Sequence, residues 1–192
     1  MAEVRSPGDE PAEFTRAVEA LTAVSVRPEV TVEPIRPPRK LAPWSFALGA
    51  RVSQGGEEVA SGRLILLHDP AGYEAWAGTL RLVTFASAEL DGEMARDPLL
   101  PEVGWSWLLD ALAEHGADYA SAGGTVTLIA STRFGDLAGR PTTTDLELRG
   151  SWTPRGDVGP HFRAWVVMLC SAAGLPPPGV ALLPQQWGEA RT

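Results

Sequence analysis

Four carboxylates lie close together between residues 91 and 102, and they form the group of side chains that most resembles a metal site. They are Asp91, Glu93, Asp97 and Glu102. Carboxylate oxygens are the ligands that Mg²⁺ and Ca²⁺ prefer, but the spacing does not match the calcium loop of an EF-hand. We therefore predict a solvated acidic loop without a metal, in which Asp91 and Glu93 are candidates for contact with a partner protein.

The residue types of a hydrolase triad occur near the end of the chain as Asp157, His161 and Ser171. A serine nucleophile usually lies on an exposed turn such as the G-x-S-x-G elbow, whereas Ser171 lies inside an apolar segment with helical spacing. Cys170, the single cysteine, lies in the same segment and has no basic neighbour that would stabilise a thiolate. We expect no catalytic residue here, and a buried structural thiol at Cys170.

The three histidines, His68, His115 and His161, are too scattered to form a zinc site. Zinc ligands typically recur at i+4 or accompany a C-x-x-C pair, and neither pattern is present. The sequence also lacks a glycine-rich phosphate loop followed by Lys and Ser or Thr. We therefore expect no metal and no cofactor.

Two aromatic residues, Tyr73 and Trp76, fall in a segment that reads as a turn between strands. Large rings in a loop are typical of a pocket rim or a partner contact, although packing within the loop also explains them. Tyr73 and Trp76, together with Asp91 and Glu93, are the predicted partner-contact residues. Most of the other tryptophans, of which the chain has seven in all, are expected in the core.

The composition is that of one folded domain over residues 1–192, with 44% hydrophobic and 21% charged residues. A formal net charge of −8 has the wrong sign for neutralising phosphates, so direct nucleic-acid binding is not expected. A single cysteine fits a reducing compartment, and no apolar run suits a signal peptide or a membrane span. We predict a cytoplasmic protein that does not contact a membrane.

The periodicity of the apolar residues predicts three helices and five strands. The helices are expected over about 11–25, over 105–115 and from Pro160 onward, and the strands over 44–53, 63–68, 79–87, 125–130 and 146–152. Asp69–Gly72 reads as a turn. Residues 1–10 are expected to be a flexible N-terminus, 26–43 a Pro-rich linker with at most an edge strand near 30–35, and 175–192 a tail that packs back on the domain.

The resulting order, α-β-β-β-α-β-β-α, predicts an α+β fold of two layers. An antiparallel five-stranded sheet would form one layer, and the helices would lie on one of its faces. Over about residues 11–174 this order resembles that of the type III secretion chaperone and YbjN-like fold.

Several stretches resemble an uncharacterised actinobacterial family that is classed as a domain of unknown function. They are LAPWSFALGARV, GRLILLHDPAGYEAWAGTLRLVTFASAEL, VGWSWLLDAL and PHFRAWVVMLCSAAGLPPPG, and the resemblance covers nearly the whole chain past residue 10. It implies no catalytic or binding residues. Members are often encoded near an RNase D-like exonuclease, and the resemblance therefore implies a link to RNA metabolism.

Two functions follow as hypotheses. The first is a non-enzymatic protein-binding or adaptor module that contacts a protein partner through Tyr73, Trp76, Asp91 and Glu93, with a homodimer as one form of self-association. The alternative is an enzyme or small-ligand-binding protein whose site lies between the sheet and the helices. That site would use the polar strand positions Arg81, Arg133, Glu147 and Arg149.

Overall fold

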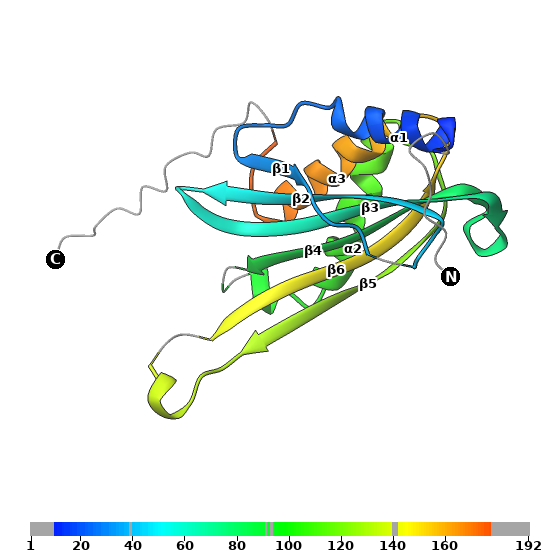
Figure 1. Cartoon of the computed structure of the whole chain (residues 1–192). Helices are drawn as coiled ribbons and strands as arrows, with labels where there is room; N and C mark the ends of the chain where they lie inside the picture. Colours follow the sequence, from blue (N-terminus) through cyan, green and yellow to red (C-terminus); the bar gives the residue numbers. More distant parts are fainter. Residues whose placement is uncertain (1–9, 39, 91, 93, 140–141, 178–192) are drawn as a thin grey trace.

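The computed structural model describes residues 10–38, 40–90, 92, 94–139 and 142–177. Within these residues the fold consists of three α-helices, three short 3-10 helices and six strands (Figure 1). The helices are α1 (Ala12–Thr22), α2 (Leu100–Glu114) and α3 (Gly159–Ala172), and the strands are β1 (Val30–Pro34), β2 (Trp44–Gln54), β3 (Glu57–Tyr73), β4 (Gly78–Leu90), β5 (Tyr119–Ser131) and β6 (Thr143–Pro154). None of the helices described is long and apolar enough to cross a membrane.

The strands form one antiparallel sheet in the order β1-β2-β3-β4-β6-β5, which confirms the predicted α+β class and corrects the strand number from five to six. The additional strand, β1, lies inside the segment predicted to be a linker and pairs with β2 from Val30 opposite Val52 to Pro34 opposite Leu48. Its Val-Thr-Val alternation favours a strand. Pro34 is tolerated because β1 is at the edge of the sheet.

The prediction of a turn at Asp69–Gly72 is wrong, because β3 continues through these residues to Tyr73. Pairing with β4 is interrupted between His68 and Tyr73, where Gly72 has a φ of 74°. The chain reverses instead at a short 3-10 helix, η1 (Glu74–Trp76), which ends at Ala77 with a φ of 56°. Local turn chemistry at Asp-Pro-x-Gly therefore produced an irregular strand and not a hairpin.

All three helices lie on one face of the sheet (Figure 1), and the core fills the space between the two layers. Gly62 of β3 lies under Leu169 and Trp165 of α3, and a Cβ at Gly62 would come within 2.7 Å of Leu169. Trp165 also donates from Nε1 to Thr84 Oγ1 at 2.8 Å. The predicted α3, apolar around most of its circumference, is thus covered within a single chain by the sheet and by neighbouring helices.

The start of the predicted C-terminal tail packs on the domain. Leu175 is buried, and Arg27 Nη1 donates to the carbonyl oxygen of Pro176 at 2.9 Å. The remainder of the tail from residue 178, and residues 1–9 of the predicted flexible N-terminus, lie outside the described residues.

Candidate interaction surface

The structure brings Tyr73 and Trp76 together at the turn between β3 and β4. Their ring centroids are 5.5 Å apart and the rings are tilted by 56°. Tyr73 is 58% exposed, whereas Trp76 is half-buried and its carbonyl oxygen accepts a hydrogen bond from Thr153 Oγ1. The two rings thus pack against each other, with one of them open to solvent.

The other two predicted contact residues, Asp91 and Glu93, lie outside the described residues. The chain enters their loop from Leu90, at the end of β4 opposite to η1. Among the part of the chain that the structure describes, no group of three or more His, Cys, Asp or Glu side chains could hold a metal ion.

Three of the residues proposed for a site between sheet and helices lie on the other face of the sheet, so that placement is wrong. Arg81, Glu147 and Arg149 alternate with the buried Leu82 and Leu148, which face the helices. Because successive side chains of a strand point to opposite faces, the polar positions are directed away from the helical layer. Arg133, the fourth residue, follows β5 in the turn to β6.

Arg81 joins three strands on this helix-free face. Its guanidinium donates to Ser151 Oγ at 2.7 Å and Thr153 Oγ1 at 3.1 Å on β6, and to the carbonyl oxygen of Ser121 at 2.8 Å on β5. Ser121 has a φ of 50° in a β-bulge. Burial lowers the pKa of Arg81, but the group stays charged. Arg81 therefore fixes the irregular start of β5, a structural role that sequence spacing alone could not reveal.

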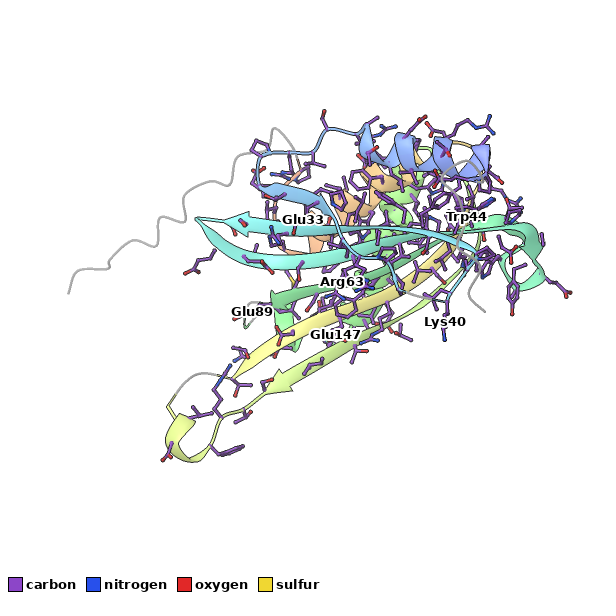
Figure 2. The ribbon with its side chains drawn as sticks, in the orientation of Figure 1. Glu33, Lys40, Trp44, Arg63, Glu89 and Glu147 are labelled. Atoms are coloured by element: carbon purple, nitrogen blue, oxygen red, sulfur yellow. The ribbon has the colours of Figure 1, made fainter. Side chains whose placement is uncertain are left out.

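A second set of polar side chains lies near the centre of the sheet face that the helices do not cover. Arg149 lies 3.1 Å from the carboxylate of Glu147 and stacks over the ring of Phe85, with 5.1 Å between the guanidinium carbon and the ring centroid. The strand register places Arg63 of β3 opposite Phe85 of β4, which is itself opposite Arg149. Figure 2 labels Glu33, Arg63 and Glu147, which come from β1, β3 and β6.

A groove of about 510 Å³ lies on the same face between the β1 end of the sheet and β4. Its charged lining consists of Glu33, Arg36, Arg51, Glu58 and Arg63. Arg51 is paired with Glu33 at 2.9 Å. Arg36 and Arg63 have no ion-pair partner among the described residues. Because three arginines and two glutamates line the groove, it carries a net positive charge in a chain of net charge −8.

A smaller cavity of about 310 Å³ lies beside Cys170 at the end of α3. The predicted buried thiol is confirmed, and burial raises the pKa of Cys170, which disfavours a reactive thiolate. Arg27 at the rim donates to both carboxylate oxygens of Glu29 at 2.9 Å, and this pairing lowers the pKa of Glu29 to about 2. Through its hydrogen bond to the Pro176 carbonyl oxygen, Arg27 holds this end of the chain in place.

The two edges of the sheet differ in how they are protected. β1 is short, carries Glu33 and ends in Pro34, which are features that discourage further strand pairing. The opposite edge, β5, has 13 residues with the sequence YASAGGTVTLIAS and contains no charged residue and no proline. Its outer side therefore offers an unprotected row of backbone donors and acceptors.

Large exposed apolar side chains occur on β5, in the turn after it and at α2, the helix that packs on β5. Of the eight such side chains among the described residues, six lie at α2, on β5 or in the turn after β5: Leu99, Val103, Tyr119, Ile129, Phe134 and Leu137. A hollow of about 300 Å³ between α2 and β5 is lined by Pro101, Glu102, Trp105, Gly124 and Val126. We call the outer edge of β5, this hollow and these six side chains the β5–α2 surface.

Over the residues that the structure describes, fold and surface together define an α+β domain with an open antiparallel sheet and one edge strand without charge. The chain belongs to the DUF3000 family, described as a protein of unknown function, whose model matches residues 10–181. This finding confirms the predicted membership of a domain family of unknown function. No curated protein and no solved structure matches the chain.

Proposed function

We propose that the chain is a non-enzymatic protein-binding module and that its partner binds at the β5–α2 surface. The observation that carries the proposal is an edge strand without charge that has most of the large exposed apolar side chains of the described residues along it, in the turn after it or on the helix beside it. Exposed apolar patches of this kind mark protein contacts, and an open edge can accept an extended segment as a further strand.

The proposal keeps the predicted class of function but moves the contact surface. Tyr73 and Trp76 lie on the turn after β3, which contacts β5 near the start of that strand, and one of the two rings is half-buried. We therefore assign the aromatic pair a smaller share of the binding free energy than Ile129 or Phe134. The predicted link to RNA metabolism is compatible with such a module and stays a prediction.

Affinity capture with matched variants tests the proposal. A tagged chain is expected to capture a stoichiometric partner, which Ile129→Lys should abolish because a lysine on an edge strand opposes strand addition. Tyr73→Ala, which removes an exposed ring at the turn after β3 and leaves the regular part of β5 unchanged, should retain it. Loss of the partner with Tyr73→Ala and retention with Ile129→Lys would contradict the assignment.

A second candidate function is the binding of a small anionic ligand in the groove on the helix-free face. Arg36 and Arg63 favour it because they lack carboxylate partners among the described residues, and guanidinium groups bind carboxylates and phosphates in bidentate fashion. The predicted alternative function is retained in this form, at a different face from the one expected.

Thermal unfolding with inorganic phosphate, citrate or a nucleoside monophosphate tests this second function. A bound ligand should raise the melting temperature of the wild-type chain, and Arg63→Gln should remove the shift. Arg155→Gln, at an exposed arginine outside the groove, is the matched control. An equal shift in both variants would indicate a nonspecific salt effect.

A further inference from the structure

The outer side of β5 has the length and regularity needed to pair with another strand. Its paired segment runs from Gly123 to Ser131, and the bulge at Ala120–Gly123 disturbs only the start of the strand. Charged side chains, prolines, bulges and short length are the usual means by which edges avoid pairing. The regular segment of β5 has none of them.

We propose that β5 binds β5 of a second copy of the chain, antiparallel and about a two-fold axis at Thr127. The proposal rests on the proposed function, because it names the partner that the β5–α2 surface binds. Pairing of this kind would join two six-stranded sheets into one continuous sheet and would leave both helical layers on the same side.

The side chains of β5 suit this register. A two-fold axis at Thr127 places Val126 opposite Leu128 of the second copy, and Thr125 opposite its Ile129. Val126 and Leu128 lie on the helix side, since they pair with the buried Leu148 and Leu146 of β6. Apolar and β-branched pairs across antiparallel strands are stabilising, so the sequence is complementary to itself on both faces.

The exposed aromatic residues at the two ends of the strand support the same symmetry. Tyr119 at the start of β5 is 39% exposed, and Phe134 after its end is 79% exposed. They lie at nearly equal distances along the chain from Thr127. In the proposed register, the turn after β5 of one copy runs past the start of β5 of the other, so that Phe134 approaches Tyr119 and both rings gain a contact.

Charge favours this edge for contact between copies. Two chains of net charge −8 repel each other, and a strand without charge places no carboxylate opposite another. In Figure 1, the ends of β5 and β6 nearest the turn that joins them extend past the helical layer.

Sedimentation equilibrium on the full chain tests the proposal. The wild-type chain is expected to have twice the monomer mass of 20.4 kDa, and Thr127→Lys should weaken the dimer at least tenfold. The matched control is Thr31→Lys, which places the same charge at an exposed threonine on the other edge strand and should leave the dimer unchanged. Circular dichroism verifies that both variants fold.

A disulfide trap tests the register. Thr127→Cys should form a covalent dimer under mild oxidation, because residues opposite each other in antiparallel strands have Cα atoms about 4.5–5.5 Å apart, within disulfide range. Thr31→Cys should form no covalent dimer under the same conditions. A dimer that Thr127→Lys dissociates but Thr127→Cys does not trap would overturn the register.

The remaining outcomes separate this inference from the proposed function. A wild-type monomer at all concentrations overturns the self-pairing. If Ile129→Lys still abolishes capture of a different protein in that case, the protein-binding function stands with a heterologous strand as the occupant. A monomer that captures no partner overturns both, and a dimer that persists with Thr127→Lys places self-association on another surface.

Discussion

His161 is a buried imidazole whose protonation is coupled to folding. Trp152 Nε1 donates to His161 Nδ1 at 3.1 Å in the core. Burial lowers the pKa of His161 to about 4, and the Arg155 backbone and the carboxylates of Asp157 and Asp118 offset this only in part. The folded chain therefore holds His161 neutral at pH values where the unfolded chain, with an ordinary pKa of about 6.5, is protonated.

The free energy of unfolding is predicted to fall as the pH is lowered from about 6.5 to about 4, because only the unfolded state binds the proton in that window. Above pH 6.5 both states are neutral at this residue, and below pH 4 both are protonated, so neither range adds to the loss. The shift corresponds to at most about 3 kcal/mol. Urea unfolding across this pH range measures it.

His161→Gln should flatten the pH dependence in this window while offering Trp152 an amide oxygen as acceptor. His115→Gln, at a half-buried histidine that ends α2, leaves His161 in place and should keep the wild-type slope. An unchanged slope in His161→Gln would assign the pH dependence to other groups.

The sequence predicted the environment of small core residues better than that of large rings at the margins. Burial of Cys170 followed from the apolar run around it and is confirmed. Of the tryptophans, Trp152 and Trp165 are fully buried, whereas Trp44, Trp105 and Trp107 only border the core. Hydrophobicity predicts that a tryptophan side chain lies on the core side of its helix or strand. The exposed fraction of the ring depends on which neighbouring elements cover it, and this is set by tertiary packing.

At the scale of elements, β5 is held to the rest of the sheet by a close contact at Gly124. A Cβ there would lie 2.2 Å from the carbonyl oxygen of Arg149 and 2.7 Å from the ring of Trp105. Both distances are far below van der Waals contact, so the strand could not keep its place under α2. The neighbouring Gly123 has no atom within 4 Å of the same position.

Gly124→Ala is therefore predicted to lower the free energy of unfolding by about 2 kcal/mol or more. Gly123→Ala, on the same strand one residue earlier, should change it by less than about 1 kcal/mol. Chemical denaturation of both variants gives the comparison. Equal stabilities would mean that β5 shifts away from β6 at little cost and that its position is not fixed by Gly124.

Element types were predictable because their apolar periods are clear, but their ends and edges were not. β2 and β6 alternate over most of their length and include the predicted strands, whereas β3 extends to Tyr73 through residues with turn propensity. An edge strand near 30–35 was considered within the Pro-rich linker, but it was not counted as a strand of the sheet, because the pairing of β1 with β2 is a tertiary interaction. The open edge of β5 depends on the strand order, which no local pattern encodes.

At the scale of the whole molecule, the net charge of the chain opposes association between two copies, whereas the uncharged edge strand β5 favours it. The net charge of −8 separates copies at low ionic strength, whereas the uncharged β5 allows them to join. Added salt screens the repulsion without weakening backbone hydrogen bonds between the strands. The proposed dimer should therefore become tighter as salt rises, unlike complexes that form by attraction between opposite charges.

This balance predicts a melting temperature that depends on protein concentration and on salt. Because a dimer is stabilised by mass action, each tenfold rise in concentration should raise the melting temperature by about 2 °C. The effect should be larger at about 0.5 M NaCl than at about 0.02 M, where the Debye length is several times greater. Thr127→Lys should lose the concentration dependence at both salt levels, while Thr31→Lys should retain it. A concentration dependence that weakens as salt rises would instead indicate that opposite charges, and not the uncharged β5 edge, hold the copies together.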